Sequence, residues 1–105
     1  MPAVDKYILT IDLGTSGPKV ALISVYGKVA DSEFHPTPVI LHAGGGAEQD
    51  PAGWWSAIMS AAQKLLAKKL VPAGDIAAVS VTTQWSGTVA VDLSIIHISE
   101  PTRPY

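Results

Sequence analysis

The spacing of apolar residues changes period twice along this 105-residue chain, and that change constrains its fold more than any other feature. Before about position 42 the apolar runs are short and separated by turn residues, which is typical of strands. Between positions 51 and 70 apolar residues recur at helical spacing. Beyond position 75 short extended runs return. The sequence therefore predicts a sheet with a single helix.

Three extended segments precede the helix. Tyr7–Ile11 and Lys19–Tyr26 flank a Gly/Thr/Ser turn, and Val29–Leu41 is a third, less regular stretch. Because short turns join them, we expect an antiparallel three-strand meander. Pro36 and Pro38 favour an edge position for the third strand, since proline cannot donate a hydrogen bond to a ladder.

The helix is predicted from Pro51 to about Leu70. Asp50 before it is a favoured N-cap residue, and proline is favoured at the first helical position. After this crossover, Ile76–Thr82 is expected to pair parallel to the first strand, and Thr88–Asp92 to form a further strand. The predicted fold class is an α/β mixed sheet with an antiparallel meander and a crossover helix, not a doubly wound nucleotide-binding unit.

Composition excludes several classes of protein. Hydrophobic residues make up 48% of the chain and charged residues 15%, which argues against disorder. The net charge of −2, without a basic stripe, argues against nucleic-acid binding. The absence of cysteine excludes disulfides and thiolate-bound zinc. No signal peptide or membrane-spanning run is recognised, so we expect a cytoplasmic protein that binds no membrane.

The most informative stretch is the turn Asp12-Leu13-Gly14-Thr15-Ser16-Gly17-Pro18-Lys19. A turn of this kind can point backbone N–H groups and two hydroxyls at phosphate oxygens. Asp12 could hold a magnesium ion through water, and Lys19 could offer a positive charge to a terminal phosphate. The alternative is a surface hairpin with a glycine-rich tip. The spacing matches neither a Walker A loop nor a GxGxxG dinucleotide turn.

Three stretches in order resemble the FGGY carbohydrate kinases, among them the xylulokinases, gluconokinases and glycerol kinases. Residues 7–19 resemble the first phosphate motif of the family. Residues 47–55, Ala-Glu-Gln-Asp-Pro-Ala-Gly-Trp-Trp, resemble the element that opens its first long helix. Residues 76–92 resemble the strand, sugar-contact turn and strand that follow. The resemblance covers about Tyr7 to Asp92.

The resemblance implies a two-domain kinase of the actin/hexokinase/Hsp70 superfamily, built from ribonuclease-H-like domains, that uses ATP and Mg²⁺. It makes Asp12 the magnesium-linked carboxylate and Gly14, Thr15, Ser16 and Lys19 the residues that bind the ATP phosphates. The catalytic base of the family lies further along the chain, so no catalytic residue is assigned here.

On the substrate side, the resemblance implies that Gln84 and Trp85 contact a sugar or polyol. Xylulokinases tend to have Gln-Met-His at this turn and glycerol kinases Gln-Arg-Glu, whereas this chain has Gln84-Trp85-Ser86, so the sugar is not assigned. Trp85 could stack on a sugar face or plug a strand end. Trp54 and Trp55 are interpreted as packing anchors.

Residues 93–105, Leu-Ser-Ile-Ile-His-Ile-Ser-Glu-Pro-Thr-Arg-Pro-Tyr, resemble no part of the family. We interpret them as a translated sequencing adapter, the alternative being a genuine divergent C-terminal strand. Residues 1–92 would then be part of an N-terminal kinase domain, inactive alone, whose full-length parent phosphorylates a sugar or polyol and could form a homodimer. The competing hypotheses are a non-enzymatic nucleotide-binding module and a small structural domain without a ligand.

Overall fold

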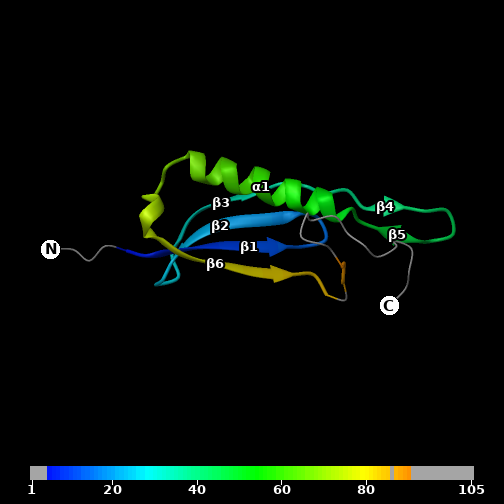
Figure 1. Cartoon of the computed structure of the whole chain (residues 1–105), viewed down its shortest axis with the longest axis horizontal. Coiled ribbons are helices and arrows are strands. Elements are labelled where there is room, and N and C mark those ends of the chain that lie inside the picture. The colour runs from blue at the N-terminus through cyan, green and yellow to red at the C-terminus, as the bar shows by residue number, and fades with distance from the viewer. Residues whose placement is uncertain (1–4, 86, 91–105) are drawn as a thin grey trace.

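A computed structural model describes residues 5–85 and 87–90 of the chain. A four-stranded mixed sheet carries one helix on one of its faces, and a small two-stranded hairpin extends beyond one end of the sheet (Figure 1). The strands of the sheet lie in the order β3-β2-β1-β6. In chain order the elements are β1 (Tyr7–Leu13), β2 (Pro18–Ser24), β3 (Val29–Phe34), β4 (Ile40–Leu41), β5 (Ala47–Glu48), α1 (Pro51–Ala67), the 3₁₀ turn η1 (Ala73–Asp75) and β6 (Ile76–Thr83).

The strand pairing confirms the predicted topology. β1 pairs antiparallel with β2, and β2 pairs antiparallel with β3. β6 then adds to the other side of β1 in parallel, with Thr10 opposite Ser80 and Asp12 opposite Thr82. A parallel partner requires a long connection, and α1 provides it. Because β1 and β6 run in the same direction, their carboxyl ends lie side by side at the same end of the sheet.

The third strand was predicted to reach Leu41, and this was wrong, because β3 ends at Phe34. Pro36 and Pro38 follow immediately and cannot donate ladder hydrogen bonds, so the chain leaves the sheet there. Ile40 and Leu41 pair instead with Glu48 and Ala47 in the β4–β5 hairpin.

The strand predicted at residues 88–92 is not observed over residues 88–90, the part of it that the structure describes. Residues 88–90 form no strand, and residues 91 and 92 lie outside the described residues. The segment 93–105, interpreted from its sequence as foreign to the family, also lies outside them. The helix ends at Ala67, three residues before the expected Leu70.

α1 begins as the sequence predicts. The Asp50 side chain accepts a hydrogen bond from the Ala52 N–H at 3.1 Å, and Pro51 occupies the first turn, where its missing N–H costs nothing. The buried side of the helix consists of Ala57, Ala61, Ala62 and Leu65. Within the described residues, no helix has both the length and the apolar character needed to cross a bilayer.

The core lies between α1 and the middle of the sheet. Val20 and Leu22 of β2 pack with Leu65 and the helix alanines, and each of the three larger side chains is at most 1% exposed. Small alanines on the helix let it approach the β2 backbone closely. The Lys68 ammonium then ties the helix end to β3 by ion pairs of 2.6 Å with Asp31 and Glu33, and these hydrogen bonds lower the pKa of Asp31 and raise that of Lys68.

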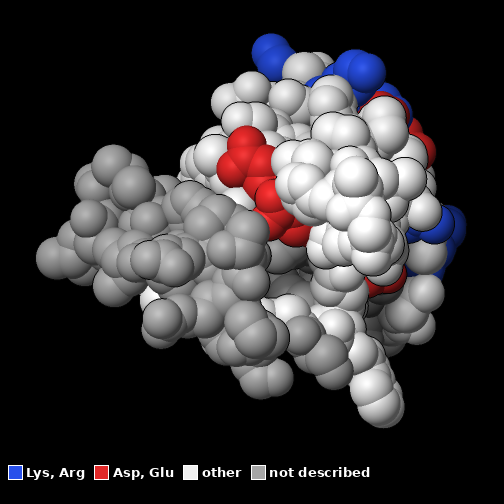
Figure 2. All heavy atoms as spheres, turned by 90° about the vertical axis from the view of Figure 1, so that its right-hand side faces the viewer, with Lys and Arg blue, Asp and Glu red and all other residues white. Residues whose placement is uncertain are grey.

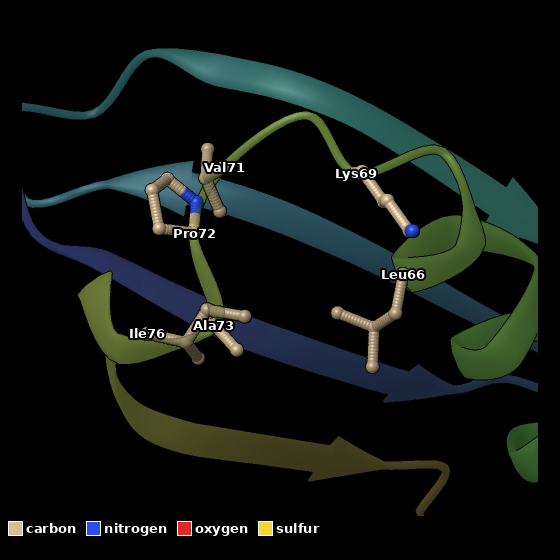
Figure 3. A pocket seen from close by; sticks show the side chains of 6 residues that line it. All are labelled: Leu66, Lys69, Val71, Pro72, Ala73 and Ile76. Atoms are coloured by element: carbon tan, nitrogen blue, oxygen red, sulfur yellow. The ribbon is translucent and has the colours of Figure 1, made fainter.

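α1 packs over β2 and β3, and the helix-side surface of β6 stays open. The register places Val79 beside Leu9 and Val81 beside Ile11, yet both valines are 60% exposed. An open apolar cavity of about 550 Å³ lies between the helix end and the start of β6, lined by Leu66, Lys69, Val71, Pro72, Ala73 and Ile76 (Figure 3). The cavity is at the sheet end where β1 and β6 begin, away from the Asp12–Lys19 turn.

Replacing Leu65 with alanine tests this core. Leu65 is fully buried, whereas its neighbour Leu66 is 42% exposed, so the two positions form a matched pair. We expect Leu65→Ala to lower the free energy of unfolding by about 2–5 kcal/mol and Leu66→Ala by clearly less. Urea denaturation followed by circular dichroism measures both. Equal losses at the two positions would contradict the packing of α1 described here.

Candidate functional site

Three segments far apart in the sequence meet at the sheet end where β1 and β6 finish. The turn at residues 14–17 follows β1, Gln49 directly precedes the N-cap of α1, and Gln84 directly follows β6. The start of α1 lies at this end because the helix runs back along the sheet to the start of β6 (Figure 1). Ligand sites of α/β sheets commonly lie beyond the carboxyl ends of parallel strands.

The turn after β1 is held rigidly by its own backbone and by the segment after β3. The Gly17 N–H donates to the Gly14 carbonyl at 3.2 Å, and the Thr37 N–H donates to the Ser16 carbonyl at 3.0 Å. Gly17 has a φ of +144°, and a Cβ at this position would overlap with the His35 carbonyl oxygen. Only glycine fits such a conformation at such a close approach.

The tip of this turn offers hydrogen-bond donors. Thr15 and Ser16 are exposed, and among the described residues no acceptor is bonded to either backbone N–H. Adjacent backbone N–H groups of a turn can form a small concavity that binds an anion. Phosphate binding by this turn stays a prediction.

Asp12 and Lys19 lie side by side next to the turn. They are direct cross-strand partners in the β1–β2 ladder, and Thr82 of β6 is the partner of Asp12 on its other side. Their strand positions alternate with the core positions Ile11 and Val20, so both side chains stand on the sheet face opposite α1. Both are exposed, and within the described ranges no ion pair joins them.

A chain of amide hydrogen bonds links the three segments. Gln49 is its centre: its Oε1 accepts from Trp54 Nε1 at 3.2 Å and from Gln84 Nε2 at 2.9 Å, while its Nε2 donates to the Thr15 carbonyl at 2.8 Å. The Thr15 hydroxyl closes the ring by donating to Gln84 Oε1 at 3.3 Å. The Gln84 backbone N–H is itself fixed to the Leu13 carbonyl at 3.0 Å.

The indole of Trp54 fixes the orientation of both amides. An indole N–H can only donate, so the Gln49 atom facing it must be the oxygen. The Gln84 atom facing that same oxygen must then be the nitrogen, which turns the Gln84 oxygen toward Thr15. The Gln49 nitrogen faces a carbonyl, which can only accept. No other arrangement of the two amides satisfies all four contacts.

The aromatic residues differ from the sequence-based interpretation in part. Trp54, interpreted as a packing anchor, is half-buried and also donates a hydrogen bond to Gln49. Trp85 is 94% exposed, so it plugs no strand end against the described residues. Trp85 directly follows Gln84 in the sequence, at the same end of the sheet as the turn.

Beside the turn, the carboxylate of Asp12 is the group that could hold a magnesium ion. The described part of the chain contains no group of three or more His, Asp or Glu side chains arranged as a metal cage. A lone exposed Asp12 fits a hydrated Mg²⁺ that phosphate oxygens also coordinate, because Mg²⁺ is commonly bound through one or two carboxylates and keeps several waters. Seen from this end, acidic side chains lie near the middle of the described surface and also at its margin, where the lysines lie (Figure 2).

Sequence reasoning missed the role of Gln49. The stretch that contains it was used only as the start of a helix, because a glutamine before an N-cap has no local function. The signal was the donor-only Trp54 five residues later, which needs an acceptor when its ring is half-buried. The other predicted residues all lie at this same end of the sheet: Asp12, Gly14, Thr15, Ser16, Lys19, Gln84 and Trp85.

Comparison with known proteins gives a consistent result. The profile of the N-terminal domain of the FGGY family of carbohydrate kinases matches residues 7–95. The chain is 36% identical over 87 residues to the xylulose kinase of Bacillus subtilis (strain 168), covering 83% of this chain and 17% of that enzyme. It is 34% identical over 87 residues to the glycerol kinase of Herminiimonas arsenicoxydans, covering 83% and 18%.

The fold has solved counterparts. The crystal structure of gluconate kinase from Lactobacillus acidophilus superimposes with a TM-score of 0.75 at 28% identity, covering 91% of this chain and 19% of that one. The predicted fold class is confirmed: a mixed α/β sheet of the ribonuclease-H-like actin/hexokinase/Hsp70 superfamily. The chain spans less than a fifth of the length of each of these relatives.

Replacing Gly17 with alanine tests the geometry of the turn. Gly27 is the matched control, since its φ is also positive, at +90°, but a Cβ there would meet open space. We expect Gly27→Ala to cost about 1–2 kcal/mol from left-handed strain alone. Gly17→Ala adds the overlap with His35 and should cost more than about 4 kcal/mol, which is exceptional for one substitution. Similar unfolding midpoints for the two variants would show that the turn is not built as described.

Proposed function

Because this chain belongs to the FGGY family of carbohydrate kinases, we propose that it forms the phosphate turn and part of the substrate site for ATP-dependent phosphorylation of a sugar or polyol. One observation carries the proposal. The turn predicted to bind phosphate and the glutamine predicted to bind sugar come from opposite ends of the fold's sequence, yet Thr15 and Gln84 are hydrogen-bonded to each other. Phosphoryl transfer requires the two substrates to lie side by side in this way.

On the phosphate side, the backbone N–H groups of Thr15 and Ser16 donate to the phosphate oxygens, and their hydroxyls can add further contacts. Lys19 contributes a positive charge from the neighbouring strand. Asp12 holds the waters of a magnesium ion, which when bound neutralises charge on the phosphates. Gly14, which has no side chain, leaves space beside the turn for the anion.

On the substrate side, Gln84 and Trp85 bind the sugar or polyol. Gln84 uses one N–H and one lone pair of its oxygen inside the network, which leaves one donor and one acceptor for hydroxyl groups. The exposed face of Trp85 can stack on the C–H face of a sugar. The relatives are named for xylulose, glycerol and gluconate, and the Gln84-Trp85-Ser86 turn does not choose among these substrates.

The proposal assigns no catalytic base to the chain. In this proposal Asp12 holds the metal. The other carboxylates described at this end of the sheet make structural contacts: Asp50 caps α1, and Glu48 pairs with His42 at 2.8 Å. The base that deprotonates the attacking hydroxyl would come from elsewhere in a longer kinase. A cytoplasmic location, where ATP is abundant, agrees with this activity.

Binding of Mg·ATP to the 105-residue chain tests the phosphate side. Asp12→Asn removes the metal-linked charge at almost constant shape, and Asp31→Asn is the control because Asp31 pairs with Lys68 away from the turn. We expect Asp12→Asn to weaken Mg·ATP binding about 10- to 100-fold, the usual loss when an outer-sphere metal partner is removed. Isothermal titration with and without Mg²⁺ measures it. Equal affinities for the Asp12→Asn and Asp31→Asn variants would refute the role of Asp12.

A kinase assay of the 105-residue chain tests the expectation that it is inactive alone. We expect no sugar-dependent ADP release from the 105-residue chain, because it lacks the base and the second wall of the cleft that excludes water. A coupled assay with a panel of pentoses, hexoses and polyols measures ADP release against a no-sugar background. Release above background that is lost in Asp12→Ala would show that the chain contains the whole catalytic site.

A further inference from the structure

The Thr15 hydroxyl can donate one hydrogen bond, and two groups could accept it: Gln84 Oε1 and an oxygen of a bound phosphate. In this structure it donates its proton to Gln84 Oε1. A phosphate oxygen can only accept hydrogen bonds, so a phosphate bound through this hydroxyl must take the same proton. We propose that Thr15 couples the two halves of the site: when it turns its proton to a nucleotide phosphate, it frees the second acceptor position of the Gln84 oxygen, so that this oxygen can accept from two substrate hydroxyls instead of one.

The Thr15–Gln84 contact is the weakest link in the network. At 3.3 Å it is the longest of the four side-chain hydrogen bonds, and it is exposed, whereas the bond from Gln84 to Gln49 is part-buried and 2.9 Å long. A hydrogen bond to a charged phosphate oxygen is shorter and about twice as strong as one between neutral groups. Phosphate therefore competes successfully for the proton.

The remaining bonds keep Gln84 from relaxing after the exchange. Once the proton has left, the oxygens of Thr15 and Gln84 face each other as two acceptors. Flipping the Gln84 amide would relieve this, but it would turn the Gln84 oxygen toward Gln49 Oε1, which Trp54 holds in place. Gln84 Oε1 is left needing a donor, and the hydroxyl of a sugar or polyol is such a donor.

This coupling rests on the proposed function, and it makes Gln49 and Trp54 positioning residues, because they hold Gln84 ready without touching either substrate. A neutral hydrogen bond has a net contribution of about 1 kcal/mol, so nucleotide should strengthen substrate binding roughly fivefold. Linkage requires that substrate strengthen nucleotide binding by the same factor.

Nuclear magnetic resonance of the ¹⁵N-labelled 105-residue chain tests the exchange directly, with Mg·ATP as the probe. In the unmodified chain we expect the backbone resonances of Thr15 and Ser16 and the side-chain amide resonances of Gln84 to shift with the same apparent Kd. Thr15→Val has nearly the same shape but no proton to exchange. That variant should bind Mg·ATP more weakly, because the hydroxyl contact to phosphate is lost. At saturating Mg·ATP its turn resonances should shift and its Gln84 resonances should not. Thr15→Ser keeps the hydroxyl and should restore both.

Each other result overturns the inference in a distinguishable way. Gln84 resonances that stay fixed in the unmodified chain while the turn resonances shift would disprove the exchange and leave the phosphate turn intact. Gln84 resonances that shift equally in Thr15→Val would mean that nucleotide reaches Gln84 without Thr15. A turn that does not respond to Mg·ATP would refute the proposed function as well. Dispersed spectra of each variant confirm that it is folded.

Discussion

The parallel pairing of β1 with β6 is the constraint on which the rest of the structure depends. It brings the end of β1 next to the end of β6, although some 70 residues of chain separate the two. The turn at residues 14–17 and Gln84 follow directly from those two ends. α1 is the crossover that makes the pairing possible, and its start brings Gln49, just before the N-cap, and Trp54, in the first turn, to the same end of the sheet. The core residues Val20, Leu22 and Leu65 fix the helix in that position.

Hydrogen bonds of neutral amide side chains, rather than ion pairs, hold the three segments of the site together. Gln49 bonds to Trp54, Gln84 and Thr15, and none of the four changes charge with pH. The charged residues Asp12 and Lys19 stand beside this ring, on the sheet face opposite α1, and no ion pair within the described residues neutralises them against each other. In the proposed function Asp12 and Lys19 interact with the ligand, while the amides hold the three segments together. This division of roles suits a site that binds a highly charged polyphosphate next to a neutral polyol.

Much of the fold and of the site could be predicted from the sequence. The change of hydrophobic period predicted the four strands of the main sheet, the helix and their topology, and the Asp50-Pro51 pair predicted the start of α1 to the residue. The end of β3 was misplaced because Val39, Ile40 and Leu41 are good strand formers, and no local signal says that they pair with Ala47 and Glu48. The tertiary partner of a short strand is not encoded in its own residues.

The hydrogen-bond network could not be predicted for a similar reason. Thr15, Gln49 and Gln84 lie 34 and 35 residues apart in sequence, and a glutamine can bond to almost any polar group. The resemblance to the FGGY family drew attention to Thr15 and Gln84 separately. Only the three-dimensional arrangement connects them, and only the donor-only indole of Trp54 fixes which amide atom faces which partner.

Exchanging this segment into a full-length relative tests whether it can serve a carbohydrate kinase and whether Asp12 is needed there. The 87 residues of the Bacillus subtilis xylulose kinase that match this chain would be replaced by those of this chain, and ADP release measured with a panel of sugars and polyols. The account predicts a cooperatively unfolding chimera that releases ADP with at least one substrate, loses that activity on Asp12→Asn and keeps it on Asp31→Asn. A folded chimera with no substrate-dependent ADP release, or one indifferent to Asp12→Asn, would contradict it.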